Sequence, residues 1–467
     1  MKNNIASASV KQWIKFSIAA AILIFFVFWL GNAWWLLLLP LIFDIYISRF
    51  VPWTAWKNSK NKVLRTIAEW VDAILFALVA VYLINTFFFQ NYKIPSSSLE
   101  KTLLVGDFLF VSKLAYGPRV PMTPLSFPLA QHTLPIINIK SYIERPQLEY
   151  RRLKGFGNVK LNDIVVFNFP TGDTVALEAQ NPDYYTLIQI YGRERVNSDK
   201  NTFGDIVYRP VDRRENYVKR CVALPGDTLQ IIDNQLYING QKQTDIPGVQ
   251  FNYYVQTTGQ YFSDEMFDNL GISKDDRLLT NNVQGGIGIL DYLGFERNKM
   301  GNHNPVYRLP LTAEMLAKLQ KLQAVSEIKI EPDVFGGHTF PLGNTEWTRD
   351  NYGPIWIPKK GMTVDINISN LPMYEQIIRN YERNQLELKD GTIFINGEKA
   401  ETYTFNMDYY WMMGDNRHNS ADSRSWGFVP EDHVVGQPVF VWLSLDKDKG
   451  LFSGKIRFDR FFKNARR

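Results

Sequence analysis

Apolar residues fill the first ninety positions of the chain in long, nearly uncharged runs. No charged residue occurs over residues 16–43, and as one helix this run would rise about 42 Å, more than the ~30 Å apolar core of a bilayer. Gly31 and Asn32 interrupt the run and indicate a turn, with tryptophans on both sides, as is common at membrane interfaces. The pattern predicts a tight hairpin of two spans, 12–30 and 33–47. One long tilted span is the alternative.

A third apolar run predicts a span over residues 71–89, after a basic loop. Positively charged loops stay in the cytoplasm, and basic residues before the first run place the N-terminus on the same side. Two spans must then separate the N-terminus from the loop, and the third span exports everything after residue 90. Buried core helices of a soluble protein and a cleaved signal peptide are less consistent with such long runs. The loop residues are Arg49, Lys57, Lys60, Lys62 and Arg65, and the N-terminal residues are Lys2, Lys11 and Lys15.

After residue 90 the pattern changes to short alternating runs of Val, Ile, Phe and Tyr, bounded by Gly, Pro, Asn and Asp. Examples are "DFLFVSKL", "NDIVVFNF", "YVKRCVAL" and "GTIFING". Such runs are typical of β-strands. Helical patterns are few, with residues 312–325 and 373–386 the best. The sequence therefore predicts a mainly β exported part behind a helical membrane anchor.

Two glycine-containing patterns stand out in this β part. The stretch "GDTLQIIDNQLYINGQ" from Gly226 is echoed by "GMTVDI" and "DGTIFINGE" after Gly361. Each copy ends in a strand and an Asn-Gly hairpin signal, which fits either two ordinary hairpins or a duplicated unit. The stretch "GGIGIL" at Gly285 lacks the third glycine of a dinucleotide-binding fingerprint, and we expect a turn into a strand there.

Composition narrows the function classes. The 467 residues are 45% hydrophobic and carry a formal charge of +5, so the chain can build a sizeable core, and its mixed charges argue against nucleic-acid binding. Cys221 is the one cysteine, which excludes an intrachain disulfide. The five histidines form no HExxH-type ligand pair. We therefore expect no metal site.

The stretch "IPSSSLEKTL" contains three adjacent serines and no histidine. A serine hydroxyl becomes a nucleophile only when a base accepts its proton, and a lysine kept neutral by burial can be that base. Lys219, in the apolar stretch "YVKRCVALPGD", fits this need. Taken alone, Lys219 would be a solvated strand lysine and Ser98 a turn serine.

Four sequence blocks nevertheless favour a catalytic role for these two residues. In chain order they are 87–117, 162–170, 216–229 and 410–443. Together with the third apolar run, they resemble type I signal peptidases, membrane-bound Ser–Lys proteases that remove signal peptides from exported proteins. The last block, with "GDNRHNSADSRSWGFVPEDHVVG", is the most specific. The resemblance implies a mainly β catalytic domain with a transmembrane helical anchor. Two alternatives stay open: a Ser–Lys protease for a narrower secretion substrate, and a domain that binds exported peptides without cutting them.

The resemblance also implies roles for individual residues. Ser98 matches the nucleophile and Lys219 the general base, while the Ser96 hydroxyl and the Ser98 N–H match the oxyanion donors. Ser420 matches the serine that orients the lysine amine. Asp422 and Arg424 match a supporting ion pair, and Gly414, Asp415 and Asn416 match the turn that positions this block. The shallow pockets for small substrate side chains match Ile94, Pro95, Leu99, Leu103, Leu109, Val166, Tyr217 and Val218.

Four positions depart from the family pattern. Ser97 replaces a common glycine, which would cost about 1 kcal/mol if the backbone there needs a positive φ. Leu99 replaces a methionine, and Lys101 replaces a proline, which predicts a less rigid nucleophile loop. His418 stands where an acidic residue is common, and the resemblance gives it no role.

Together, these expectations divide the chain into a membrane anchor, a catalytic core and an insertion. Residues 1–90 form the anchor, 91–240 and 406–467 the catalytic β core, and 241–405 a long insertion that forms a second, non-catalytic subdomain without a recognisable motif. The resemblance places the protein in the cytoplasmic (inner) membrane as a multi-pass protein, with its catalytic domain on the extracytoplasmic side. Its implied partners are signal peptides of exported preproteins, the lipid bilayer and a nearby secretion translocon. No metal or organic cofactor is needed.

Overall fold

The computed structural model describes residues 8–53, 55, 60–135, 137 and 139–466. These residues belong to two compact units. The first combines Met1–Phe89 with Tyr116–Phe156, and the second combines Gln90–Ala115 with Gly157–Arg467. Each unit is described by itself.

Apolar helices make up most of the first unit. Helix α2 covers Val10–Leu30 and α4 covers Lys62–Phe87, and both are long and apolar enough to cross a membrane. Between them lies a shorter apolar segment, composed of the 3-10 turn η1 (Ala33–Leu37), α3 (Leu38–Phe43) and the π turn η2 (Asp44–Ser48). Gly31 turns the chain with φ 62°. The Phe43 ring lies 5.5 Å from that of Phe16, so this segment runs back along α2.

The loop Tyr116–Phe156 packs against the ends of both long helices. Leu153 shares a buried cluster with Leu30 at the end of α2 and Phe87 at the end of α4. The Arg151 guanidinium donates to the Leu30 carbonyl oxygen at 2.6 Å. The C-terminal ends of α2 and α4 therefore lie next to the same loop.

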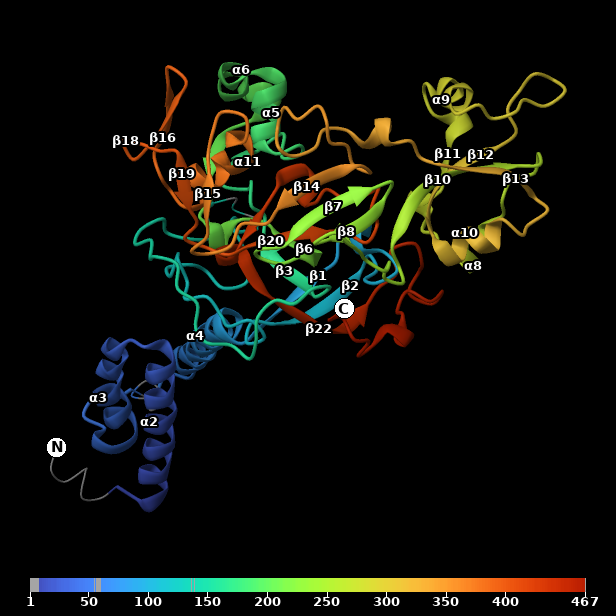
Figure 1. Cartoon of the computed structure of the whole chain (residues 1–467). Coiled ribbons are helices and arrows are strands. Elements are labelled where there is room, and N and C mark those ends of the chain that lie inside the picture. Colours follow the sequence, from blue (N-terminus) through green and yellow to red (C-terminus); the bar gives the residue numbers. More distant parts are fainter. Residues whose placement is uncertain (1–7, 54, 56–59, 136, 138, 467) are drawn as a thin grey trace. The chain divides into compact units, whose positions relative to one another are not determined.

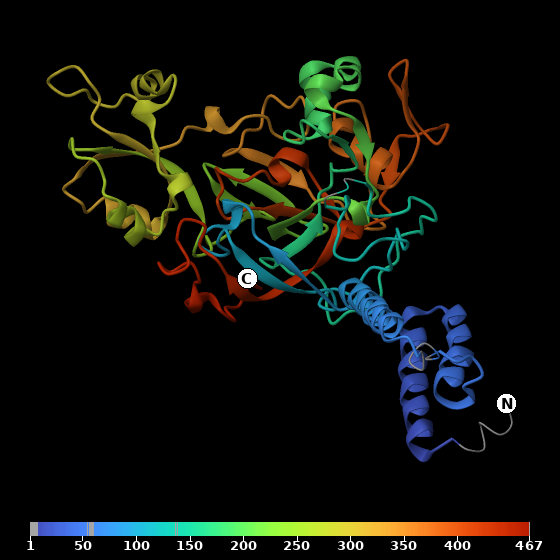
Figure 2. The same ribbon diagram turned by 180° about the vertical axis from the view of Figure 1, so that it is seen from behind.

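A seven-stranded sheet forms the centre of the second unit (Figures 1 and 2). Its strand pairs β2–β22, β22–β3, β3–β6 and β6–β20 are antiparallel, so segments from both ends of the second unit alternate in it. The predicted mainly β domain with an apolar helical N-terminus is confirmed. In sheet order, the strands are β1 (Phe89–Lys93), β2 (Asp107–Ser112), β22 (Val434–Ser444), β3 (Ile164–Asn168), β6 (Asn216–Ala223), β20 (Tyr409–Met413) and β21 (Val429–Pro430).

The first echoed stretch forms a three-strand meander, and the "DGTIFINGE" part of the second lies in a similar one, whereas "GMTVDI" forms β15 (Thr363–Asp365), which pairs with β19 (Thr402–Thr404). In the first, β7, β8 and β9 are joined by turns at Asp233–Asn234 and Asn239–Gly240; in the second, β16, β17 and β18 are joined at Asp390–Gly391 and Asn396–Gly397. Both residues of every turn have positive φ, the requirement of a type I′ hairpin. The strands are Thr228–Ile232, Gln235–Ile238 and Gln241–Lys242 in the first copy, and Leu386–Lys389, Thr392–Ile395 and Glu398–Lys399 in the second.

The predicted insertion 241–405 contains two different parts. The first folds around its own sheet of β11, β12, β10 and β13, with α8 and α10 on one face and α9 on the other (Figure 1). The second part, from β14 onward, shares a buried cluster with core strands, and β14 pairs with β7. The bounds are β10 Gln250–Thr257, α8 Asp264–Leu270, β11 Leu278–Leu279, α9 Gly286–Tyr292, β12 Val306–Thr312, α10 Ala313–Leu319, β13 Val325–Ile330 and β14 Tyr352–Trp356.

Several helices differ from the sequence prediction. "GGIGIL" begins α9 rather than a strand, because Gly285 adopts φ 76° at the helix start and Leu290 is buried against the sheet. The predicted helix 312–325 is shorter, and 373–386 is replaced by α11 (Leu371–Gln376) and the π turn η9 (Ile377–Tyr381). The remaining elements are β4 (Thr174–Ala176), α5 (Tyr184–Tyr191), α6 (Arg193–Ser198), α7 (Lys200–Phe203), β5 (Ile206–Tyr208) and α12 (Ser423–Trp426).

Candidate active site

The loop between β1 and β2 carries the three serines. Ile94 closes the base of this loop, because its N–H donates to the Asp107 carbonyl and its carbonyl accepts from the Gly106 N–H. Ser97–Leu99 form one 3-10 turn. Leu99, 1% exposed, and Leu103, 0% exposed, anchor the loop in a buried apolar cluster. The loop therefore holds Ser98 at a fixed place beside the sheet.

Lys219 on β6 reaches this loop. Its Nζ lies 2.6 Å from Ser98 Oγ, a hydrogen-bond distance. Lys219 is 5% exposed, and burial lowers the pKa of its amine to about 8, against the opposing charges of Asp422 and Asp415. Arg424 lowers this pKa further. A substantial fraction of the amine is therefore neutral near pH 8 and can accept a proton.

Ser96 and the 414–416 turn surround the Ser98 side chain and backbone. Ser96 Oγ lies 3.5 Å from Ser98 Oγ. The Asn416 N–H donates to the Ser98 carbonyl at 3.1 Å, and its side-chain amide donates to the Ser97 carbonyl at 3.3 Å. Gly414 has no room for a side chain, since a Cβ there would lie 2.6 Å from the Ser98 carbonyl oxygen.

Buried charge pairs hold this turn in place. Asp415 receives two hydrogen bonds from the Arg220 guanidinium, at 2.8 and 2.7 Å, and a third from Thr102 Oγ1 at 2.7 Å. Asp422 receives two from Arg424, at 2.9 and 2.8 Å, and one from the Gly414 N–H at 3.1 Å. Bidentate Arg–carboxylate pairs fix geometry as well as charge, so the segment 414–424 is rigidly oriented against the nucleophile loop.

Ser420 differs from the expectation. Its hydroxyl donates to the Ala421 carbonyl at 3.4 Å, and no hydrogen bond joins it to Lys219 among the residues that the structure describes. Ser420 Oγ nevertheless lies close to the Cα of Gly414, in the same wall of the site. The Lys219 amine is held here by its hydrogen bond to Ser98 and lies over the Tyr217 ring, 5.8 Å from its centroid.

A cavity of about 370 Å³ opens beside Ser98 and Lys219. Ile94, Pro95, Leu109, Val166, Tyr217 and Val218 line it, and Leu99 and Leu103 do not. Leu99 and Leu103, which the resemblance assigns to the pockets, are instead buried at 1% and 0% exposed. The sequence comparison missed further lining residues: Tyr92, Lys93, Ser97, Glu215, Asn216, Asn419 and Ala421. Tyr92 and Asn216 could have been found, since they lie on the two strands that frame the cavity.

The backbone strain of the loop falls at Lys101 and not at Ser97. Lys101 has φ 72°, whereas Ser97 is outside the positive-φ region. A proline could not adopt this angle, so the loop of this chain differs in conformation from the proline-containing pattern. The Lys101 ammonium contacts the Leu270 and Gly271 carbonyl oxygens at the end of α8, which restrains the loop from outside.

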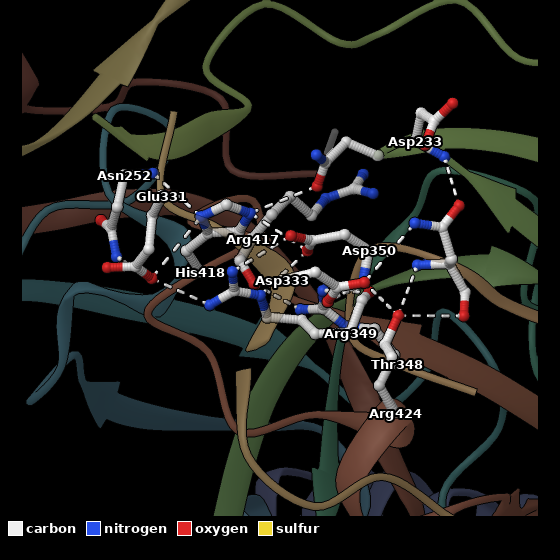
Figure 3. A network of polar contacts seen from close by, with 12 residues as sticks. Asp233, Asn252, Glu331, Asp333, Thr348, Arg349, Asp350, Arg417, His418 and Arg424 are labelled. Carbon is white, nitrogen blue, oxygen red and sulfur yellow. Dashed lines mark hydrogen bonds and ion pairs between the residues drawn. The ribbon is translucent and has the colours of Figure 1, made fainter. Parts of the chain in front are cut away.

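Two buried histidines lie near this region, each within its own network. His433 contacts Asp432 through Nδ1 and Arg214 through Nε2. Figure 3 shows His418 between Asn252, Glu331 and Asp350. Its Nδ1 accepts from the Asn252 N–H at 3.2 Å, and its Nε2 lies 3.1 Å from Asp350 Oδ1. Both nitrogens of each ring are therefore engaged away from Ser98.

Known proteins share this arrangement of sequence blocks. The family model described as "Signal peptidase, peptidase S26" matches residues 67–284 and 357–443. The chain belongs to this signal peptidase family. Signal peptidase I of Helicobacter pylori (strain J99) is 38% identical over 419 residues, which cover 86% of this chain and 95% of that protein. Those of Buchnera aphidicola (subsp. Acyrthosiphon pisum) and Haemophilus influenzae are 23% identical over 412 residues and 24% identical over 409 residues. The matched parts cover 86% and 87% of this chain and 83% and 78% of those proteins.

Membership in this family makes the protein a serine peptidase, a hydrolase of peptide bonds. The match covers the Ser98 loop, β3, β6 and the 414–424 segment. It leaves out residues 285–356, which include α9, β12, α10, β13 and the whole of β14. This signal peptidase thus carries a stretch of its inserted sheet outside the family pattern.

Proposed function

We propose that this signal peptidase cleaves signal peptides from exported preproteins with Ser98 as nucleophile and Lys219 as general base. The observation that carries the proposal is the 2.6 Å contact between Ser98 Oγ and the Lys219 amine, combined with the burial that lowers the Lys219 pKa to about 8. A lysine can serve as a base only when it is neutral. Its position on a buried strand supplies that condition without a histidine.

In acylation, Ser98 Oγ forms a bond to the carbonyl carbon before the cleavage point, and its proton passes to Lys219. The oxyanion accepts hydrogen bonds from the Ser98 N–H and the Ser96 hydroxyl, and removal of one such donor typically costs ~3–4 kcal/mol of transition-state stabilisation. The C–N bond then breaks, and Lys219 returns the proton to the leaving amine. The mature protein leaves, and the signal peptide stays esterified to Ser98.

In deacylation, a water attacks the ester carbon, and Lys219 accepts the proton of that water. The second tetrahedral intermediate uses the same two donors, and its collapse returns the proton from Lys219 to Ser98 Oγ. The signal peptide is released as a free acid, and the enzyme regains its starting state. Ser420, in the wall beside Gly414, would orient the lysine amine during these steps.

The cavity supports a preference for small side chains next to the cleavage point. Its apolar residues Ile94, Leu109, Val166 and Val218 surround a volume of about 370 Å³. These side chains offer no hydrogen-bonding group, which favours an apolar substrate side chain such as a methyl group next to the cleavage point. We propose alanine or another small residue at the first and third positions before the cleavage point.

The proposed site of action is the outer face of the cytoplasmic membrane, next to the secretion translocon. Two helices of this protein are long and apolar enough to span a bilayer. β1 follows α4 almost directly and leads within a few residues to Ser98. Because an extended chain covers at most ~3.6 Å per residue, this connection supports a nucleophile close to the membrane surface.

The test is cleavage of a purified preprotein by the full chain in lipid vesicles, with the product identified by mass spectrometry. We expect one cut, after an Ala-X-Ala sequence, and none with Ser98→Ala or Lys219→Ala. Lys219→Arg should also be inactive, because a guanidinium stays protonated. The Ser98→Ala/Lys219→Ala double variant should be no slower than either single variant, since the two groups act as one unit. Cleavage that survives in Lys219→Ala would contradict the proposed base.

A further inference from the structure

The inserted sheet contacts the back of the active site through the first residues of β10. The Gln250 N–H donates to the Asp415 carbonyl, and the Gln250 carbonyl accepts from the Arg417 N–H, both at 2.8 Å. These two bonds form a parallel bridge between β10 and the turn at Asn416. The insertion is therefore hydrogen-bonded directly to the segment that supports Ser98.

Asn252, two residues further along β10, holds the next part of that segment. Its side-chain amide pairs reciprocally with that of Asn419, with N···O distances of 3.1 and 3.0 Å. Its backbone N–H donates to His418 Nδ1. Asn419 lines the substrate cavity. Asn252 thus contacts a residue that lines the substrate cavity, although Asn252 itself lies in the inserted sheet.

The surroundings of Asn252 require an amide at this position. Asn252 is 0% exposed, its Nδ2 donates to both Asn419 and Glu331, and its Oδ1 accepts from Asn419. Its carbonyl accepts from the Glu331 N–H at 2.9 Å. A carboxylate here would face the oxygens of Glu331 and Asn419 without a proton to share, and an aliphatic side chain would remove both hydrogen bonds to the Asn419 amide.

Residues outside the family-model match complete this network. Glu331 also accepts from Arg349 at 3.0 Å, and Arg349 pairs with Asp350 at 2.9 Å (Figure 3). Asp350 in turn contacts His418 Nε2. Because Nδ1 of His418 accepts a hydrogen bond, Nε2 must carry the ring proton, and Asp350 stabilises that tautomer. Residues of the segment 285–356 therefore hold Asn252 and His418 in position through these hydrogen bonds and ion pairs.

A second contact joins the same sheet to the nucleophile loop. Lys101 donates to the Gly271 carbonyl at 2.5 Å and to the Leu270 carbonyl at 3.3 Å, at the end of α8. Lys101 and Asn419 lie on the two different segments that form the site. The inserted sheet thus holds both segments at once, although none of its own residues lines the cavity.

We propose that Asn252 is a positioning residue of this signal peptidase, and that the inserted sheet acts through it to fix Asn419 and the adjacent Ser420 against the substrate and Lys219. The inference rests on the proposed Ser98–Lys219 function. Residues 419–422 have no regular secondary structure of their own, and loops that carry functional groups depend on a rigid support. A small displacement of such groups costs rate more than it costs binding.

The test is a double-mutant cycle with Asn252→Ala, Asn419→Ala and the double variant, in the full chain in detergent. We expect Asn252→Ala to lower kcat for cleavage of the preprotein by about 10- to 100-fold, with KM changed less than about threefold. If Asn252 acts through Asn419, the double variant should be no slower than Asn419→Ala. Hydrogen exchange of residues 415–421 should rise in Asn252→Ala, and this readout needs no substrate.

Gln256→Ala is the matched control, because Gln256 is also a buried amide on β10 that donates to a backbone carbonyl, that of Glu296, within the inserted sheet. It should lower Tm by a similar amount while kcat stays within about twofold. Asn252→Asp, of nearly equal volume, should show the same kcat loss and replaces Asn252→Ala if that variant does not fold.

Two outcomes would overturn the inference. One is a kcat for Asn252→Ala and Asn252→Asp that equals the control. The other is a double variant in which the two losses multiply, which would mean that Asn252 does not act through Asn419. Failure of the proposed function would be recognised separately, because the wild-type chain would then cleave the preprotein no faster than Ser98→Ala.

Discussion

Lys219, the proposed general base, is the residue whose environment gives the most direct prediction about activity. Its folded pKa of about 8 means that the base is mostly protonated below that pH and mostly neutral above it. We expect kcat/KM of the free enzyme to rise tenfold per pH unit below pH 8 and to level off above it. A pH–rate profile over pH 5.5–9.5 with a soluble signal-peptide substrate measures this limb. A profile that levels off below pH 6.5 would point to a different base.

Glu100 provides the control for that profile. Burial raises the pKa of this carboxyl to about 7, and it lies two residues after Ser98, so its titration could distort the same limb. Glu100→Gln removes the titration and keeps the shape of the side chain. The rise of kcat/KM up to pH 8 should persist in this variant. Its disappearance would assign the limb to Glu100 instead of Lys219.

The burial of Lys219 also predicts a cost in stability. The folded pKa is lowered from 10.5 to about 8, so the unfolded chain binds more protons between these values, and stability rises with pH across that window. Below pH 8 the full penalty applies, up to about 3 kcal/mol for a shift of this size. Lys219→Met should therefore raise Tm at pH 7 in detergent, with a gain that shrinks towards pH 10.5. A lower Tm at pH 7 would show that the ammonium is stabilised by its neighbours Asp422 and Asp415.

The sequence pairs residues that a motif marks, and it does not pair residues that only the fold brings together. Ser98 and Lys219 are 121 positions apart and were paired through the motif blocks. Asn252 and Asn419 are 167 positions apart, and no motif marks Asn252. Leu99 and Leu103 were assigned to the pocket by the resemblance alone, and the sequence does not show which side of a loop an apolar side chain faces.

Among the elements, the loop between β1 and β2, which carries Ser98, is the one whose conformation we expect to be most sensitive to mutation. Lys101 holds φ 72°, a strained angle for a residue with a side chain, and its ammonium contacts the end of α8. Lys101→Gly should relieve about 1 kcal/mol of backbone strain while removing the contact. We therefore expect little change in Tm and a lower kcat. Lys101→Arg, which keeps a cation but not the backbone freedom, should retain more activity, and the reverse order would mean that strain matters more than the contact.

Strands were easier to predict than helices in this chain. β2 alternates buried and half-buried residues along its length, and β3 is buried throughout, so both left a clear sequence pattern. The helices α5 to α7 are short, are flanked by glycines and contain aromatic and polar residues, which masks their periodicity. Asp183 caps α5 by accepting from the Tyr185 and Thr186 N–H groups, and this N-cap was the signal available in the sequence.

At the scale of the whole molecule, the packing of the apolar helices bears on the number of membrane spans. Leu30 and Phe87 pack on the same residue, Leu153, so the two long helices end on the same side. In the three-span arrangement, their N-termini share the other side, and the apolar segment between them returns across the bilayer. At 16 residues from Ala33 to Ser48 it would span about 24 Å as a helix, which is short but sufficient with local thinning.

Cysteine labelling tests this topology. With Cys221 replaced by alanine, single cysteines at Lys11 and Lys60 should react only after the membrane is opened, whereas one at Gln147 should react in intact cells. These positions lie before α2, before α4 and in the loop 116–156. Labelling of Lys11→Cys from outside, with Lys60→Cys protected, would replace the three-span arrangement with two spans.

The loop 116–156 predicts one more property of the whole enzyme, contact with lipid. Leu125, Phe127, Leu129, Ile139 and Ile143 are all exposed, Leu129 at 78%. The same loop packs on the ends of α2 and α4, and Tyr82 on α4 donates to the Pro124 carbonyl. Exposed apolar side chains next to the ends of membrane helices favour insertion into the bilayer surface. We expect Phe127→Glu and Leu129→Glu to slow cleavage of a preprotein inserted in vesicles at least several-fold, because a charge there opposes insertion. Cleavage of a short soluble peptide should stay unchanged.

Leu322→Glu, at an exposed apolar position of the second unit, is the control and should affect neither substrate. Equal slowing of both substrates by Leu129→Glu would mean that this surface supports the fold of the enzyme and not its contact with the membrane.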